Sequence, residues 1–199
     1  DKIYKDKPKK TMPFYSLPRN ITGESRQSKI DKIKNFLQSN KADYLFISAP
    51  ENVAWLLNIR GFDSPTSPIP NSRLIIDKDK QLFLMTDKKK IQKIIKEKVI
   101  KKHQVLNFNE FKVLINQLKG ANFIIDNQSC SVFAEKEISS KFKILNQTDP
   151  IYKLKSIKNI SEIKNMIHVH KKDGLALTRF IYWIKNINKN EITEVEAQV

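Results

Sequence analysis

The sequence has few of the residues on which many catalytic and binding motifs depend. Its 199 residues include one cysteine, four glycines and three histidines. The single cysteine, Cys130, excludes an internal disulfide and a cysteine-based zinc cluster, and it fits a reducing compartment. The four glycines are dispersed, which leaves no glycine-rich phosphate loop and no Gly-x-Ser-x-Gly nucleophile elbow. The sequence therefore argues against nucleotide-dependent chemistry.

Long apolar runs are also missing. No stretch approaches the roughly 20 apolar residues that a membrane-spanning helix needs. The first eight residues are rich in charge where a signal peptide would need an apolar segment. We therefore expect a soluble, cytoplasmic protein without membrane contact.

Acidic residues are scarce relative to basic ones, and the formal net charge is +16. Clustered cations would favour nucleic acid, because they neutralise phosphates. However, only five of the 37 basic residues are arginine, whereas base recognition favours arginine and aromatic residues. Lysine is spread along the chain beside isoleucine and asparagine, as AT-rich codons would produce. We expect no specific nucleic-acid partner, and keep a basic binding module for RNA or an acidic partner as the alternative function.

Short apolar runs that predict buried strands alternate with segments in which apolar residues recur at helical spacing. Strands are predicted at 44–47, 73–76, 82–85, 105–106, 123–125 and 142–145, and helices from Ser28, from Pro50, at 91–100, at 111–118 with Gly120 closing it, and at 131–139 with Ser131 as its cap. Five polar residues separate the second strand from the third, which predicts an antiparallel hairpin. The fold class is therefore α/β with a mixed sheet.

The two ends of the chain differ from this alternating pattern. Residues 1–23 contain three prolines and no apolar period, so we predict a linker or a wrapping segment there. A domain boundary is predicted at Asp149 and Pro150, after which no strand follows. Asn159 and Glu162 have the spacing of a capping box at the start of a long helix. Its apolar stripe, at 160–184, has little to pack against within the chain, so we expect a truncated sequence.

The residues with catalytic potential do not form a convincing set. His168 and His170 are two apart on the predicted helix, so they point in different directions and cannot hold one metal ion together. No histidine lies near Cys130 in sequence, which favours an inert thiol. Asp126, Asp77 and Asp79 could imitate the carboxylates of a two-metal nuclease, but a solvated hairpin turn explains the last two more simply.

The most unusual segment is 53–63, in which an apolar helix ends in a loop with a tryptophan, an arginine, a glycine and an aspartate. Its simplest interpretation is structural. Trp55 then belongs to the core, Gly61 permits a positive φ, and Arg60 pairs with Asp63.

Residues 55–63 nevertheless resemble the middle domain of three-domain aminopeptidase P, in which a Trp-Leu run passes into Asn-x-Arg-Gly-x-Asp. Residues 1–8 are similar to the family stretch Asp-Lys-Ile-Trp-x-Asp-Arg-Pro, with Tyr4 for tryptophan and Lys7 for arginine. Downstream, the positions that resemble the entry to the family's catalytic domain are Asp149, Pro150, Ile151, 155–159, Glu162, Met166, His170, Asp173, Trp183, Thr193 and Glu194. Each motif is short, and their order along the chain makes the resemblance specific.

This resemblance implies a fold and a division into domains. Residues 1–23 would be a linker from a missing first domain. Residues 24–148 would form a middle, creatinase N-terminal-like (ribonuclease-H-like) α/β domain with a mixed sheet. Residues 149–199 would be the first helices of a truncated pita-bread catalytic domain.

The resemblance also implies an activity for the whole enzyme. It would be a metallopeptidase that releases an N-terminal residue preceding proline, with two divalent ions, usually manganese, and it would form a homodimer. In family order the metal ligands follow Val199, so we expect no catalytic or metal-binding residue in this chain and no activity from it alone. Arg60, Gly61 and Asp63 are structural or cleft-lining candidates, with Arg60 and Asp63 as substrate-cleft candidates. A catalytically inactive homologue that acts as a structural subunit is a further alternative.

Overall fold

The computed structural model describes residues 12–187 and 192–198. The contacts within the chain divide it into two units, with the division between Lys158 and Asn159. Each unit is described by itself. Within the described residues, no helix is both long enough and apolar enough to cross a membrane.

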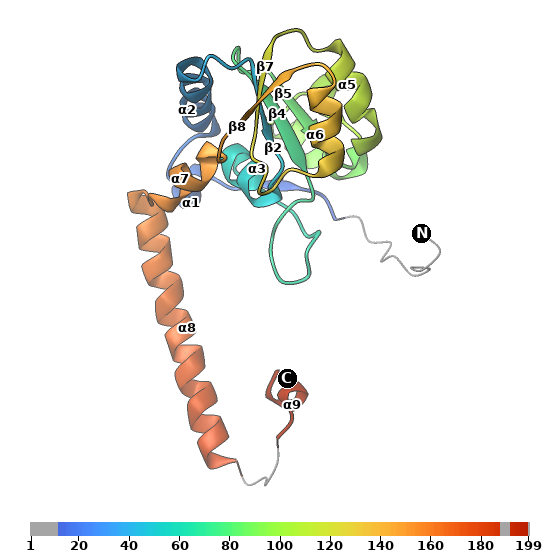
Figure 1. The fold of residues 1–199 in the computed structure, drawn as a ribbon. Helices are drawn as coiled ribbons and strands as arrows, with labels where there is room; N and C mark the ends of the chain where they lie inside the picture. The colour runs from blue at the N-terminus through green and yellow to red at the C-terminus, as the bar shows by residue number, and fades with distance from the viewer. Residues whose placement is uncertain (1–11, 188–191, 199) are drawn as a thin grey trace, which may run out of the picture. The chain divides into compact units, whose positions relative to one another are not determined.

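The first unit is built around a six-stranded sheet with the strand order β6-β5-β4-β2-β7-β8 (Figure 1). Its strands are β2 (Tyr44–Ile47), β4 (Arg73–Asp77), β5 (Leu82–Met85), β6 (Val105–Leu106), β7 (Asn122–Ile125) and β8 (Lys143–Asn146). β4 is antiparallel to its neighbours β2 and β5, whereas β5 pairs with β6, β2 with β7, and β7 with β8 in parallel. A single strand thus runs against the other five, and the predicted mixed sheet and antiparallel hairpin are confirmed.

Both faces of the sheet are buried, because successive side chains of a strand point to opposite faces. In β2, Leu45 and Ile47 belong to one core cluster and Tyr44 and Phe46 to the other. The first cluster includes apolar residues of α2 (Arg26–Ser39), α3 (Pro50–Leu57) and α4 (Gln92–Lys96), and the second includes those of α5 (Phe111–Gln117) and α6 (Val132–Ser139). Helices therefore cover both faces of the sheet (Figure 1).

Residues 12–23 pack onto the first unit. Phe14 is fully buried in the first core cluster. β1 (Tyr15–Ser16) pairs antiparallel with β3 (Ile59–Arg60), and the short helix α1 (Arg19–Thr22) follows. This part of the predicted segment therefore wraps around the unit. The linker predicted for residues 1–11 lies outside the described residues.

Several predicted helix and turn signals are confirmed by hydrogen bonds. The Ser131 hydroxyl accepts from the Ala134 N–H at 3.3 Å, which caps α6. In the β4–β5 hairpin, a carboxylate oxygen of Asp77 accepts from the N–H groups of Asp79 and Gln81, each at 2.8 Å. The Asp77 carboxylate therefore organises the hairpin turn, as the simpler interpretation predicted.

The helix predicted at 91–100 is wrong in its length. α4 ends at Lys96, and Lys98 has a positive φ of 54°, which stops the helix. Val99 and Ile100 are nevertheless buried in the first core cluster. Their spacing correctly predicted that they are buried. However, they lie in a turn that follows the helix and not in the helix itself.

Gly120 does not close α5, which also differs from the prediction. α5 ends at Gln117, and its C-cap residue Leu118 has an extended backbone. Gly120 has a φ of 153° and approaches Asp43, whose carboxylate accepts from the N–H groups of Ala121 and Asn122 at 2.8 and 3.1 Å. A Cβ on Gly120 would lie 2.9 Å from that carboxyl group. The glycine therefore lets Asp43 reach the start of β7.

Three 3₁₀ helices and α7 complete the first unit: η1 (Lys88–Lys90), η2 (Lys102–Gln104), η3 (Phe108–Glu110) and α7 (Pro150–Ser156). α7 packs against α3, and its Ile151 is fully buried. The contacts thus group residues 149–158 with the sheet domain, whereas the boundary predicted from the sequence lies after residue 148.

The second unit consists of α8 (Ile160–Asn186) and α9 (Glu194–Gln198). The predicted capping box is confirmed, because the Asn159 side chain accepts from the Glu162 N–H at 3.0 Å and the Glu162 carboxylate accepts from the Asn159 N–H at 2.9 Å. α8 has no buried residue. The exposed members of its apolar stripe include Ile160, Ile163, Ile167, Leu177, Ile181 and Ile184.

Close packing explains why residue 61 is a glycine. Its φ is not positive, so the predicted conformational role is wrong. A Cβ at this position would lie 2.8 Å from the Pro70 Cα and 3.0 Å from the Phe14 ring. The absence of a side chain lets the loop that follows β3 close onto Phe14.

We expect Gly61→Ala to lower the free energy of unfolding by about 1–3 kcal/mol, because the added methyl group overpacks a buried site. Urea denaturation measures this. Gly174→Ala is the matched control, because a Cβ there has nothing within 4 Å, and it should not destabilise the chain. Equal effects of the two substitutions would contradict the packing explanation.

Candidate functional site

The candidate site begins at the C-terminal end of α3, where a lysine from α2 is buried. Lys29 is only 2% exposed. Its ammonium group donates to the Trp55 carbonyl oxygen at 2.9 Å and to Asn58 Oδ1 at 2.7 Å, and it lies 3.9 Å from the centroid of the Trp55 ring. A buried charge is costly unless it is hydrogen-bonded and paired with polar groups. Residues 55–58 supply these groups.

Asn58 joins three segments of the first unit. Its φ of 54° ends α3 in the left-handed conformation, which asparagine tolerates better than most residues. Its side-chain amide donates to the Glu24 carbonyl at 2.9 Å, and its own carbonyl accepts from the Leu17 N–H at 2.8 Å. The end of α3 is thereby fixed to α2 and to the segment that carries β1.

Trp55 is half-buried and packs against the first core cluster, so the predicted core role is confirmed. Its indole N–H is buried and has no hydrogen-bond partner among the described residues. The ring contributes its face to Lys29 through a cation–π contact. Its role is therefore to pack and to hold a cation.

Arg60 does not pair with Asp63, which corrects the sequence prediction. Its guanidinium donates to the carbonyl oxygens of Ile59 at 2.8 Å and Ala54 at 3.4 Å. Burial lowers the pKa of this side chain. Carbonyl groups near the C-terminus of a helix attract a nearby cation. The Ala54 carbonyl is such a group, and it also accepts from the Asn58 N–H that caps α3. Arg60 thus folds back onto α3.

Asp63 instead joins the loop to η1. One carboxylate oxygen accepts from the Asn71 N–H at 2.7 Å, and the other forms an ion pair with Lys90. The two side chains of that pair are only 14% and 17% exposed. The Lys90 carbonyl in turn accepts from the Phe14 N–H at 2.8 Å. Asp63 therefore closes the loop between β3 and β4 and ties it to the N-terminal segment.

A second buried polar cluster lies where α7 meets α3. Asn52 donates to Asp149 Oδ2 at 2.7 Å and accepts from Lys155 at 2.6 Å, and Asp126 Oδ2 accepts from the Asp149 N–H at 2.9 Å. Burial raises the pKa of Asp149. Since these carboxylates already accept hydrogen bonds from the chain itself, they hold α7 in place and are not arranged for two-metal chemistry.

The other reactive side chains show no catalytic arrangement. Burial raises the pKa of the Cys130 thiol to about 11, so the nucleophilic thiolate is scarce at neutral pH. His168 is exposed, and His170 Nδ1 lies 2.8 Å from the Met166 carbonyl oxygen. Within the described parts of the chain, no three His, Cys, Asp or Glu side chains are grouped so as to hold a metal ion.

A cavity of about 240 Å³ lies at the carboxyl ends of β2 and β7, the place where open α/β sheets often bind ligands. Ser48, Arg73, Ser129 and Phe133 are among its lining residues, and the hydroxyl groups of Ser48 and Ser129 are 2.6 Å apart. Neither Arg60 nor Asp63 lines it. The structure therefore does not bring the two cleft candidates to this cavity.

Sequence reasoning missed the lysines that complete these sites. Lys29 lies one helical turn before Ile33 and on the apolar side of α2, which was the available signal for its burial. Lys90 lies 27 residues from Asp63 in sequence, and no local pattern indicates that pairing.

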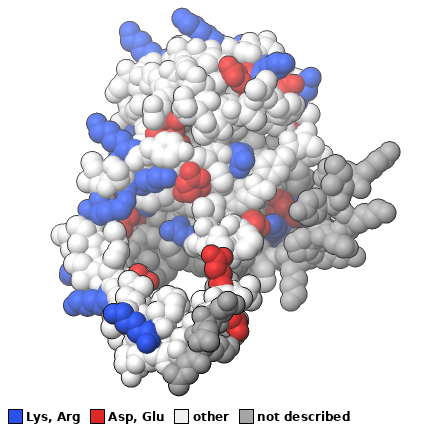
Figure 2. Space-filling model, turned by 60° about the horizontal axis from the view of Figure 1, so that its bottom comes forward, with Lys and Arg blue, Asp and Glu red and all other residues white. Residues whose placement is uncertain are grey.

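The surface charge is dispersed on the face that Figure 2 shows. Lysine and arginine side chains are separated there by uncharged and acidic ones. Several lysines form ion pairs, including Lys32 with Glu24, Lys78 with Asp43, and Lys88 with Glu110. This face lacks the continuous basic stripe that marks a nucleic-acid interface.

The sheet, its two covered faces and the locked loop define a mixed α/β domain without a catalytic constellation among its described residues. The chain belongs to the Creatinase/Prolidase N-terminal domain family, whose match covers residues 6–162. The predicted family and the creatinase N-terminal-like fold class are thereby confirmed.

Curated relatives extend this similarity over most of the chain. Xaa-Pro aminopeptidase 1 of Dictyostelium discoideum is 29% identical over 86% of the chain and 27% of its own length. Xaa-Pro aminopeptidase ApepP of Drosophila melanogaster is 29% identical over 96% of the chain and 32% of its own length. The chain thus spans about a third of these relatives or less.

A solved structure supports the fold. The X-prolyl aminopeptidase of Caenorhabditis elegans, described as a cytosolic enzyme with a di-nuclear active site, aligns with a TM-score of 0.82. The alignment covers 98% of the chain and 33% of that protein at 22% identity. The chain therefore shares its fold with one part of that enzyme.

We expect Lys90→Ala to lower the free energy of unfolding by about 1–3 kcal/mol, because it leaves the largely buried Asp63 carboxylate without its cation. Lys88→Ala is the matched control. Lys88 pairs with Glu110 at 2.7 Å, but the two side chains are 44% and 39% exposed, so its loss should change stability by no more than about 0.5 kcal/mol. Urea denaturation measures the free energy of unfolding of both variants. An unchanged free energy in Lys90→Ala would contradict the proposed role of Asp63 in closing the loop.

Proposed function

We propose that this chain is a non-catalytic part of an Xaa-Pro aminopeptidase, an enzyme that releases an N-terminal residue preceding proline. The observation that carries the proposal is the similarity to relatives of that name, which extends over 86% and 96% of the chain. Their substrates would be peptides with proline in the second position. On this proposal, the chain frames the active-site cleft and supports assembly.

The two divalent ions of such an enzyme, which we propose to be manganese, do not fit the residues described here. These residues contain no group of three metal ligands, and Asp126 and Asp149 are engaged in internal hydrogen bonds. The ions would therefore be held by residues of the catalytic region that the relatives have and this chain does not cover. When bound, they would supply a nucleophilic water and stabilise charge on the substrate carbonyl.

Arg60 and Asp63 would act as positioning residues for the cleft. Arg60 uses its guanidinium to hold the turn between α3 and β3, and Asp63 uses its carboxylate to hold the loop between β3 and β4. Between them Phe62 is 52% exposed, and its ring stacks on that of Tyr15 with the centroids 5.4 Å apart. We propose that the loop presents this aromatic surface to the cleft, and that Arg60 and Asp63 fix its position.

The remaining proposals concern the organisation of the whole protein. Residues 24–148 would be its middle domain and residues 149–199 the start of its catalytic domain, with α7 anchored on the middle domain. The enzyme would form a homodimer and act in the cytoplasm, a location that the C. elegans enzyme's description supports.

The test uses the full reading frame that contains this chain, purified and loaded with manganese. We expect it to release the first residue of an Xaa-Pro-Xaa peptide but not of the matched Xaa-Ala-Xaa peptide, while the 199-residue chain alone releases neither. A folded, metal-loaded full-length protein without turnover would indicate an inactive structural homologue. Turnover by the 199-residue chain alone would contradict the non-catalytic role.

A salt titration tests the alternative of a basic binding module. Nonspecific attraction between lysines and RNA should vanish as the salt concentration rises to physiological levels. Specific RNA binding that persists at that salt concentration would favour the alternative function.

A further inference from the structure

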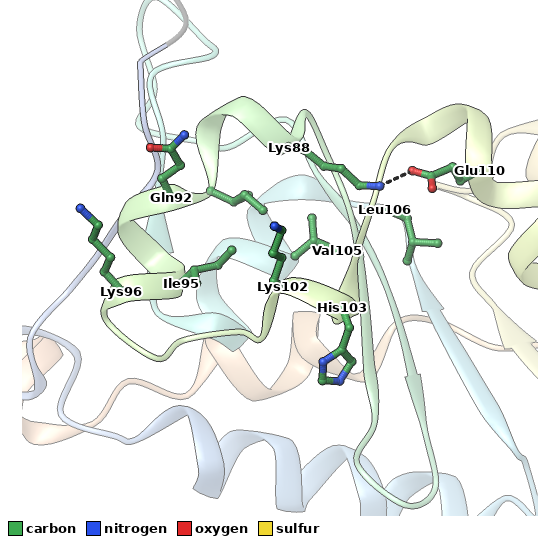
Figure 3. A pocket seen from close by; sticks show the side chains of 10 residues that line it. Lys88, Gln92, Ile95, Lys96, Lys102, His103, Val105, Leu106 and Glu110 are labelled. Carbon is green, nitrogen blue, oxygen red and sulfur yellow. Dashed lines mark hydrogen bonds and ion pairs between the residues drawn. The ribbon is translucent and has the colours of Figure 1, made fainter.

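A cavity of about 920 Å³ lies beside β6, at one edge of the sheet (Figure 3). Residues of η1, α4, η2 and β6 line it. Its volume falls within the range of small-molecule sites, which is roughly 300–1,000 Å³. None of the residues of the candidate functional site lines it, so it is a separate feature of the domain.

The floor of this edge cavity is apolar and continuous with the core. Ile91 and Val105 are 3% and 4% exposed and belong to the first core cluster. Ile95 and Leu106 are half-buried and complete the apolar surface. Because these side chains are fixed by the core behind them, the floor is preformed. An apolar ligand that lies on this floor removes the exposed parts of Ile95 and Leu106 from water, which favours binding.

The rim carries positive charge that the nearby acidic groups do not neutralise. Lys96 and Lys102 are exposed, and neither has an ion pair within residues 12–187. Glu110, the acidic residue of the lining, is 2.7 Å from Lys88 and accepts from the Asn107 N–H. The carboxylate of Glu97, which follows α4, accepts a hydrogen bond from the Ser16 hydroxyl at 2.7 Å. Cationic ligands are therefore disfavoured.

Figure 3 identifies the cation that meets the apolar floor. The Lys102 side chain extends alongside Ile95 and Val105, whereas Lys96 and Gln92 point outward from α4 and His103 points away from the cavity. An ammonium group beside an aliphatic surface suits a ligand with a negative head and an apolar tail. Lysine binds an anion as a point charge, without the forked geometry with which arginine binds carboxylates and phosphates. A singly charged carboxylate therefore suffices as the partner of this one ammonium group.

We propose that this edge cavity binds a small amphiphilic carboxylate, whose aliphatic chain covers Ile91, Ile95 and Val105 and whose carboxylate pairs with Lys102. The positive charge of the rim favours the ligand's carboxylate, and the preformed apolar floor favours its aliphatic tail. A peptide added as a further strand fits less well, because β6 has only two residues and offers few backbone partners.

The test titrates the 199-residue chain with octanoate by isothermal titration calorimetry, with 1-octanol and octylammonium as ligands of the same chain length. We expect saturable octanoate binding that is tighter than that of octanol, and no octylammonium binding. Lys102→Met should weaken octanoate binding about fivefold and leave octanol binding unchanged. Lys102→Glu should weaken octanoate binding about tenfold or more. Both changes lie at an exposed side chain, so the fold should persist, and circular dichroism verifies this.

Lys136→Met is the matched control, because Lys136 is exposed on α6 and does not line the edge cavity. It should bind octanoate as the unchanged chain does. The proposal is overturned by the absence of saturable binding, by equal affinity for octanoate and octanol, or by a Lys102→Met variant that binds normally. It is also overturned if sedimentation shows that the chain self-associates and that Lys102→Glu abolishes the association, which would make this face an interface between copies. None of these results bears on peptidase activity.

Discussion

The first unit depends on how it accommodates one buried cation. The Lys29 ammonium comes from the apolar side of α2, and the residue is only 2% exposed. It requires the Trp55 carbonyl, the Trp55 ring and the Asn58 side chain at fixed positions. Meeting this requirement ends α3 at Asn58 and turns the chain into β3. The positions of Arg60, Gly61 and Asp63 follow from that turn.

Residues 55–63, which resemble a motif of aminopeptidase P, therefore have a structural role in this chain. The polar groups of Arg60 and Asp63 are satisfied by carbonyl oxygens, by the Asn71 N–H and by Lys90. On our proposal the consequence for function is indirect, because the fixed loop would present Phe62 to a substrate cleft.

The sequence predicted the features that depend on local patterns. The continuous apolar run at 44–47 indicated a strand buried on both faces, and the polar pentapeptide at 77–81 indicated the hairpin. The sequence-based predictions were wrong where tertiary contacts determine the partner of a side chain or the end of a helix. Arg60 and Asp63 are close in sequence but bind different partners, and Lys98 stops α4 before Val99 and Ile100. Lys29 escaped notice because lysine is ordinarily solvated.

A double-mutant cycle between Lys29 and Asn58 tests this account most directly. The free energies of unfolding of Lys29→Met, Asn58→Ala and the double variant are compared with that of the unchanged chain by urea denaturation. If the buried cation fixes the end of α3, the two sites should be coupled by at least about 1 kcal/mol, because each substitution removes the other residue's partner. Additive effects, with a coupling energy near zero, would contradict the account.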